Sequence, residues 1–285
     1  MADAATRSPI ARARSLLFVP GTRMDRFDKA HATGAGCVIV DLEDAVPPDQ
    51  KADAREQIGA RLPLCSAEVL ARTLVRINAA DTPHLGADLE VAAGWVAQGL
   101  GGVVLPKADA EALRRAAAAL GARAALVPLV ESLAGLDAVD ALANAPQVVR
   151  LAFGHLDFQL DLGMRCSAEE GELAPVRFAL VSASRRAHLP APIDGVTVDT
   201  GNEARLQADV QRARAFGFGG KLCIHPAQVP SVNAAFAPTA AELAWARRVV
   251  EGAEQHMGRA FSLDGRMVDL PVILAARQTL EQASG

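Results

Sequence analysis

The sequence predicts a closed α/β barrel of the (β/α)₈, or TIM-barrel, class, followed by a C-terminal helical extension. Eight short apolar runs alternate with amphipathic stretches up to Ile224, without a break in composition. This alternation is typical of a parallel barrel of about 250 residues. An open doubly wound sheet would need a glycine-rich phosphate turn after its first strand, but the chain has the sequence VPGTR at Val19–Arg23. We therefore predict the closed barrel.

The expected strands are short and almost wholly apolar, as strands buried on both faces of a parallel sheet should be. Between them, apolar residues recur at helical spacing. The predicted strands are Leu16–Val19, Cys37–Val40, Thr73–Ile77, Gly102–Leu105, Ala124–Val130, Val148–Phe153, Ile193–Val196 and Lys221–Ile224. The predicted helices are Asp25–Ala32, Asp49–Ala60, Leu85–Ala97, Ala110–Leu120, Leu133–Leu142, Glu172–His188 and Glu203–Ala215.

The chain continues beyond the eighth strand with two further helical patterns. Thr239–His256 has apolar residues on one side, and a last helix is expected from Pro271, because proline suits a first helical position. The polar segment Gly258–Asp269 between them is expected to form a lid, or a flap onto a neighbouring subunit. The expected domains are a flexible N-terminal tail (1–13), a catalytic barrel (14–237) and a C-terminal helical extension with the lid (238–285).

Composition and charge narrow the functional class. The formal net charge is −4, whereas a nucleic-acid-binding protein normally carries a concentrated basic surface. No apolar run approaches the roughly 18 residues that span a bilayer, and the N-terminus lacks the apolar core of a signal peptide. The four cysteines are far apart and form no CxxC pair, which favours a reducing, cytoplasmic location. We expect an enzyme that acts on small molecules.

Ionisable residues follow nearly every predicted strand. Active sites of such barrels form at the C-terminal ends of the strands, and an ordinary structural barrel has no need to gather charges there. In strand order, these ends carry Arg23, the DLED turn of Asp41, Glu43 and Asp44, Arg76, Lys107, Glu131, the turn from Gly154 to Asp157, Asp194 or Asp199, and His225.

Two of these carboxylates predict a metal site. Glu131 ends the fifth strand and Asp157 follows the sixth, and the two strands should be neighbours in a βαβ unit. Two acids at one edge, with other positions left to water, suit Mg²⁺. The alternative is that each acid only caps a helix or forms an ion pair.

Arg76 and Lys107 each have two interpretations. The guanidinium fork of Arg76 matches a substrate carboxylate, or it forms ion pairs with Asp41, Glu43 or Asp44. These acids could also orient Arg76 and Lys107 or hydrogen-bond to metal-bound waters. Lys107 could form a Schiff base. The alternative is that a charged Lys107 pairs with the carboxylates, and a metal held by two acids makes the Schiff base less necessary.

Several segments, in order, resemble the citrate lyase β-subunit-like (CitE-like) branch of the HpcH/HpaI aldolase family. The resemblance runs from about Arg14 to Val229. The segments are RSLLFVPGTRMDRF (Arg14–Phe27), GCVIVDLEDAVPPDQKADAR (Gly36–Arg55), LVRINA (Leu74–Ala79), VVLPKAD (Val103–Asp109), VPLVES (Val127–Ser132) and GKLCIHPAQV (Gly220–Val229). The tail FSLDGRMVDLP (Phe261–Pro271) resembles the lid of the malyl-CoA and citramalyl-CoA lyase branch.

The resemblance implies a Mg²⁺-dependent carbon–carbon lyase, with Mn²⁺ as a second possible ion. Such an enzyme cleaves a 3-hydroxyacyl-CoA, for example citryl-, malyl- or citramalyl-CoA, into acetyl-CoA and a 2-keto acid, or runs the reverse Claisen condensation. It also implies a homotrimer in which the lid reaches a neighbouring subunit. The implied roles are metal ligation by Glu131 and Asp157, keto-acid binding by Arg76 and Gly154, coenzyme A binding by Arg14, Arg23, Lys221 and His225, and acid–base catalysis by Asp269.

One departure leaves the substrate open. The family usually has Gly-Ala-Glu-Asp where this chain has Gly154-His155-Leu156-Asp157. The metal aspartate is kept, but the residues before it differ. The acyl group, its stereochemistry and the direction of the reaction, thioester hydrolysis included, are not fixed by the sequence. Two alternatives are a class II aldolase acting on a CoA-free hydroxy-keto acid and a degenerate subunit or binding module.

Overall fold

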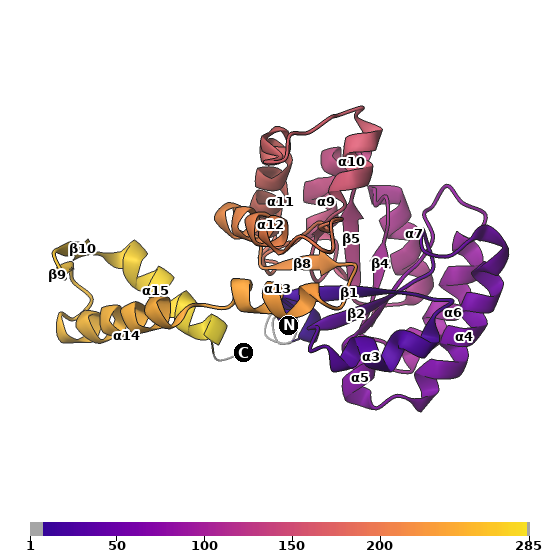
Figure 1. The fold of residues 1–285 in the computed structure, drawn as a ribbon, viewed down its shortest axis with the longest axis horizontal. Coiled ribbons are helices and arrows are strands. Elements are labelled where there is room, and N and C mark those ends of the chain that lie inside the picture. The colour runs from indigo at the N-terminus through magenta and orange to yellow at the C-terminus, as the bar shows by residue number, and fades with distance from the viewer. Residues whose placement is uncertain (1–7, 284–285) are drawn as a thin grey trace. The chain divides into compact units, whose positions relative to one another are not determined.

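The computed structural model describes residues 8–283 and confirms the predicted barrel. Eight parallel strands pair in chain order, and β8 pairs with β1 to close the sheet (Figure 1). The strands are β1 (Ser15–Pro20), β2 (Cys37–Asp41), β3 (Thr73–Arg76), β4 (Gly102–Leu105), β5 (Leu126–Val130), β6 (Ala152–Phe153), β7 (Ile193–Asp194) and β8 (Gly220–Cys223).

Helices follow the strands and cover the outside of the barrel (Figure 1). They are α3 (Phe27–Ala32), α4 (Lys51–Arg61), α5 (Ala67–Ala71), α6 (Leu85–Ala97), α7 (Ala110–Leu120), α8 (Leu133–Asp137), α9 (Val139–Asn144), α10 (His155–Asp161), α11 (Ala174–Arg186), α12 (Glu203–Phe216) and α13 (Gln228–Phe236). One further helix, α2 (Pro9–Arg12), precedes β1, and its Ile10 belongs to the interior cluster of the barrel. Short polar residues cap several of them: the side chains of Asp109, Ser132 and Asn202 accept a backbone N–H from the first turn of α7, α8 and α12.

The barrel interior is aliphatic, as the scarcity of aromatic residues requires. Leu16, Ile39, Leu74 and Val104 are at most 1% exposed and belong to one cluster contributed by every strand. Burying such side chains contributes about 1.5–3 kcal/mol each. The cluster holds the strands in register, so that residues at their C-terminal ends meet on one face.

Several boundaries differ from the predicted ones. Pro9–Arg12, which were expected to lie in a flexible tail, form α2, and Ile10 is only 1% exposed. Residues 1–7 of the expected tail lie outside the described residues. The expected helix Leu133–Leu142 is two helices that meet at Ala138. The expected turn after the sixth strand is the helix α10, so Asp157 lies in its first turn.

The C-terminal residues form a second compact unit. Residues 8–233 belong to the barrel unit and residues 234–283 to the C-terminal unit, close to the predicted boundary at 237. The second unit contains α14 (Ala240–Gln255), the antiparallel hairpin of β9 (Phe261–Leu263) and β10 (Arg266–Val268), and α15 (Leu270–Ala283). Its apolar core includes Ala246, Val249 and Ile273. Across residues 8–283, none of the helices has the length and apolar character needed to cross a membrane.

Candidate active site

The ends of β2 and β3 bring Asp41 and Arg76 together. The two residues are register partners in neighbouring strands. Arg76 Nε and Nη2 donate to the two carboxylate oxygens of Asp41 at 2.6 and 2.7 Å, and both side chains are buried. Such a bidentate charged pair has a fixed geometry. One edge of the Arg76 fork is therefore taken by Asp41, so a substrate carboxylate has only the outer edge, formed by Nη1 and Nη2.

That outer edge lies beside two further acids of the DLED turn. Arg76 Nη1 is 2.9 Å from Glu43 Oε2 and 3.3 Å from Asp44 Oδ2. The guanidinium also lies over the ring of Phe18, 4.9 Å from its centre. Burial works to lower the pKa of Arg76, but the hydrogen bonds to Asp41 and the charges of Asp41, Glu43 and Asp44 outweigh it and raise the pKa. The guanidinium stays charged at any ordinary pH.

Glu43 is unusual among these acids because it is buried without a full set of partners. It is 7% exposed, and its Oε2 makes an ion pair with Arg76 but no well-aligned hydrogen bond. Burial, to which the negative charges of Glu131 and Asp44 add, raises the pKa of Glu43 to about 8 despite the opposing charge of Arg76. With its pKa raised, Glu43 takes up a proton more readily than an ordinary carboxylate, which lessens the repulsion among the acids.

Glu131 follows the end of β5, and Asp157 lies in the first turn of α10, which follows β6. The pairing of Leu129 with Ala152 makes these strands neighbours, as predicted. Glu131 is 3% exposed. Burial raises its pKa to about 7, and the nearby charge of Asp157 adds to the shift, while the hydrogen bond from the Lys107 amide and the charge of Arg76 oppose it. The structure therefore places the two carboxylates close enough to interact, on the same face as Arg76.

Two backbone features shape the space around Glu131. Lys107 has a φ of +42°, and its amide donates to Glu131 Oε1 at 2.7 Å. Its side chain is exposed, so the contact with the acid comes from the backbone rather than from the expected ammonium group. Gly154 packs directly against Glu131, and an added Cβ there would lie 2.6 Å from the Cβ of Glu131. The amide of Gly154 donates to Val130 O at 2.9 Å, so this residue supplies space rather than a donor.

The residues expected to bind coenzyme A are divided between two ends of the barrel. Arg23 and His225 follow β1 and β8, which are paired, and both are exposed at the C-terminal face. Arg23 forms a bidentate ion pair with Asp25, with both contacts at 2.9 Å. Arg14 instead precedes β1, at the opposite end of the barrel.

Lys221 is also placed differently from the expectation. It is 1% exposed, and its ammonium donates to Gly195 O inside the protein. Burial lowers its pKa, although Asp194 and Asp209 are nearby and oppose this. A buried ammonium and an arginine at the far end do not reach a ligand at the strand ends. We therefore do not retain Arg14 and Lys221 for coenzyme A.

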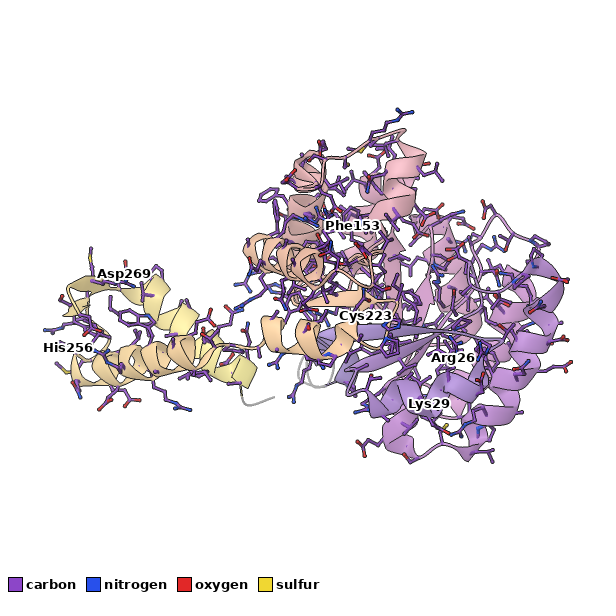
Figure 2. The ribbon with its side chains drawn as sticks, viewed as in Figure 1. Arg26, Lys29, Phe153, Cys223, His256 and Asp269 are labelled. Carbon is purple, nitrogen blue, oxygen red and sulfur yellow. The ribbon has the colours of Figure 1, made fainter. Side chains whose placement is uncertain are left out.

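Asp269 lies in the C-terminal unit, between β10 and α15 (Figure 2). Its carbonyl oxygen accepts the amide of Ile273 at 3.0 Å, which starts α15. The side chain is partly exposed. Its assignment as an acid–base group stays a prediction.

The sequence analysis did not predict two buried polar contacts near the site. Lys51, at the start of α4, donates to the backbone of the DLED turn. His155 faces Glu170, with 3.6 Å between Nε2 and Oε1, and Glu170 also pairs with Arg177 at 2.6 Å. Lys51 is part of the DLED segment that carries the resemblance. No motif in the sequence links His155 to Glu170.

The chain is similar to one protein family and to several known proteins. The family model "HpcH/HpaI aldolase/citrate lyase" matches residues 14–226. A citrate lyase subunit beta-like protein of Deinococcus radiodurans is 36% identical, with 96% of this chain and 98% of the relative covered. A (3S)-malyl-CoA thioesterase of Cereibacter sphaeroides is 34% identical, with 95% of this chain and 94% of the relative covered.

A solved structure has a similar fold over the whole chain. CitE of Mycobacterium tuberculosis, in complex with magnesium, acetoacetate and coenzyme A, has a TM-score of 0.82 and 33% identity, and the match covers 96% of this chain and 98% of CitE. The fold, the family model and these relatives agree. The chain belongs to the HpcH/HpaI aldolase/citrate lyase family.

Proposed function

We propose that this protein is a Mg²⁺-dependent lyase that cleaves a 3-hydroxyacyl-CoA, such as citramalyl-, malyl- or citryl-CoA, into acetyl-CoA and a 2-keto acid, or joins them. The observation that carries the proposal is the pair Glu131 and Asp157 beside Arg76, at one face of the barrel. Family membership supports the CoA thioester as the substrate class, and the CitE complex with magnesium and coenzyme A supports both ligands.

The residues at the strand ends suit a magnesium ion. Glu131 and Asp157 offer hard carboxylate oxygens, which Mg²⁺ prefers, and leave other positions to water and substrate. The glycine at 154 leaves room beside Glu131 that any side chain would fill. Among the described residues, no three His, Cys, Asp or Glu side chains form a metal cluster; the proposal assigns two protein ligands, Glu131 and Asp157. When bound, Mg²⁺ would supply a Lewis acid for the oxygen at the reacting carbon.

The side chains of the protein have separate roles in the proposed reaction. The outer edge of Arg76 binds and orients the carboxylate next to the reacting carbon. In cleavage, a solvent water takes the proton of the 3-hydroxyl group, whose oxygen becomes the keto oxygen as the bond between the α- and β-carbons breaks. Its electron pair goes to the acetyl-CoA enolate, which takes a proton from Asp269. In condensation, Asp269 removes that proton instead.

Arg23 and His225 remain for the coenzyme A chain. Both lie at the C-terminal face, where the reacting groups gather. Arg23 would bind phosphate oxygens by exchanging its partner Asp25 for them, since guanidinium groups bind phosphate and carboxylate in the same geometry.

The test is a matrix of substrates in both directions. Purified protein is incubated with acetyl-CoA, Mg²⁺ and either glyoxylate, pyruvate or oxaloacetate, and acyl-CoA products are quantified by mass spectrometry. We expect one keto acid to yield product and EDTA to abolish the yield. Full activity in EDTA, or no product from any acyl-CoA in either direction, would contradict the proposal. Turnover of a CoA-free hydroxy-keto acid alone would favour the class II aldolase.

Thioester hydrolysis is the second candidate, because a (3S)-malyl-CoA thioesterase is 34% identical over nearly the whole chain. The same assay distinguishes the two reactions. A lyase releases acetyl-CoA and a keto acid, whereas a thioesterase releases free CoA and the intact hydroxy acid. Release of free CoA from malyl-CoA, without acetyl-CoA, would assign hydrolysis instead.

A further inference from the structure

Lys51 is a buried lysine whose hydrogen bonds go to one turn of the backbone. It begins α4 and is 6% exposed. Its Nζ donates to Leu42 O at 2.7 Å and to Glu43 O at 2.8 Å. A charged lysine is seldom buried to this extent unless it is paired. Here the partners are the carbonyl groups of the DLED turn, so the ammonium group fixes the path of that turn.

The same turn carries the carboxylates that surround Arg76. Asp41 accepts the amides of Glu43 and Ala45 at 2.9 and 3.0 Å, in addition to the two bonds from Arg76. Glu43 contributes its own ion pair to Arg76. The turn is therefore bound from two sides, by Lys51 of α4 and by Arg76 of β3.

Charge links Lys51 to the site as well. Burial lowers the pKa of Lys51, and the carboxylates of Asp41, Asp88 and Glu43 oppose this, so the ammonium lies within the field of the acids. If Lys51 lost its positive charge, Arg76 alone would have to balance the charges of Asp41, Glu43 and Asp44. Repulsion among the acids would then favour a wider turn and a displaced guanidinium group.

We propose that Lys51 is a positioning residue that sets the orientation of Arg76 through the carbonyl groups of Leu42 and Glu43, and so determines the affinity for the carboxylate of the 2-keto acid. This inference rests on the proposed function, in which Arg76 binds that carboxylate. Lys51 touches no reacting atom. Its removal should weaken keto-acid binding and leave the recognition of coenzyme A, at β1 and β8, unchanged.

The test compares Lys51→Met with Lys29→Met. Methionine keeps an unbranched apolar side chain and removes the charge, and Lys29 is an exposed lysine of α3 that serves as the matched control (Figure 2). Condensation kinetics are measured with the keto acid that the wild type uses, and pyruvate binding in the presence of Mg²⁺ is measured by calorimetry. In Lys51→Met we expect KM for the keto acid and Kd for pyruvate to rise about tenfold, with KM for acetyl-CoA unchanged; Lys29→Met should behave as the wild type.

The outcomes separate this inference from the proposed function. A wild type that neither binds pyruvate nor condenses any keto acid overturns the proposed function itself. If the wild type is active but Lys51→Met has an unchanged KM for the keto acid, only the positioning role is overturned. The same holds if Lys51→Met shows only a lower kcat and a lower Tm. If Lys51→Met does not fold, Lys51→Gln keeps an uncharged N–H donor group and should show a smaller rise in keto-acid KM; an unchanged value there overturns the role equally.

Discussion

The carboxyl group of Glu131 depends on its neighbours for its properties. It is buried, it accepts the amide of Lys107, and it lies close to the charge of Asp157. A carboxylate in such a place is costly unless a cation or hydrogen-bond donors compensate for the charge. This environment is consistent with the metal-ligand role that we propose for Glu131.

Replacing Glu131 by glutamine should remove the metal-dependent activity. Glutamine has almost the same shape but no charge, so we expect a loss of activity of at least about 10²–10⁴-fold, together with weaker Mg²⁺ binding in calorimetry. Asp137→Asn, an acid-to-amide change at an exposed position of α8, is the matched control and should have wild-type activity. Wild-type activity of Glu131→Gln in the presence of EDTA would remove Glu131 from the site.

Gly154→Ala tests the space around the same carboxylate. The added methyl group would lie 2.6 Å from the Cβ of Glu131, so one side chain or the backbone must shift. Overpacking of this kind costs about 1–3 kcal/mol, and we expect activity to fall at least about tenfold while the protein still folds. Gly86→Ala is the control, because nothing lies within 4 Å of a Cβ at that position of α6. Equal activity of both variants would show that the space beside Glu131 is not needed.

At the scale of elements, the sequence predicted the strands better than their side-chain environments. All eight strands were found from their apolar runs, because burial on both faces leaves a clear pattern. Which end of a strand a residue occupies could also have been read from the chain: Arg14 precedes β1 and so lies away from the other strand ends. The burial of Lys221 could not be predicted, because it depends on Gly195 and Asp194 of the neighbouring strand region.

The contacts of Arg76 were also only partly predictable from the sequence. The strand pattern predicted the position of Arg76 beside the DLED turn, and pairing with Asp41 was one of two interpretations. The choice depends on the register of β2 and β3, which places Asp41 directly opposite Arg76. A shift of one residue would have turned these side chains to opposite faces. The bidentate pair is therefore a product of register, which a single sequence specifies only weakly.

The contact between α3 and β3 should make stability depend on pH. The Nε2 atom of His31, in α3, lies 3.1 Å from Thr73 Oγ1. Burial, together with the charge of Arg72, lowers the pKa of His31 to about 4. The folded state therefore favours neutral His31. In the unfolded chain, the imidazole of His31 takes up a proton near pH 6.5. The contribution of His31 to stability is therefore present above that pH and is lost as the pH falls towards 4.

His31→Gln removes this dependence. Urea unfolding of the wild type and the variant at a series of pH values between about 7 and 4 measures it. We expect the free energy of unfolding to fall less steeply in the variant, and His256→Gln, at an exposed position of α14's C-terminal end, to follow the wild type. Parallel curves for all three proteins would show that His31 titrates alike in the folded and unfolded states.

On the scale of the whole molecule, the chain divides the proposed chemistry between two units. Arg76, Glu131 and Asp157 belong to the barrel unit and Asp269 to the C-terminal unit. The C-terminal unit has its own apolar core, which includes Val249 and Ile273, and the capping box of Thr239 and Glu242 gives α14 a defined start. The proposal leaves open whether Asp269 serves the barrel of its own chain or that of another copy.

Mixed oligomers distinguish these two arrangements. Asp269→Asn and Glu131→Gln should each be nearly inactive alone. If Asp269 acts on a neighbouring subunit, as the resemblance to the lyase lid implies, then co-expression of equal amounts gives sites that combine an intact Glu131 from one chain with an intact Asp269 from another. Random assembly predicts about a quarter of wild-type activity in the mixture, whereas a site completed within one chain predicts none.

The control for this experiment is a second acid of the same unit. Asp264 is exposed and pairs with Arg248 at 2.6 Å, both in the C-terminal unit. Asp264→Asn should be active alone, and its mixture with Glu131→Gln should retain about half of the wild-type activity, because only the barrel residue is then limiting. The activity of the Asp269→Asn and Glu131→Gln mixture is compared with that of this control mixture. Activity regained in the first mixture would show that the site is completed between subunits and that a monomer of this chain cannot turn over its substrate.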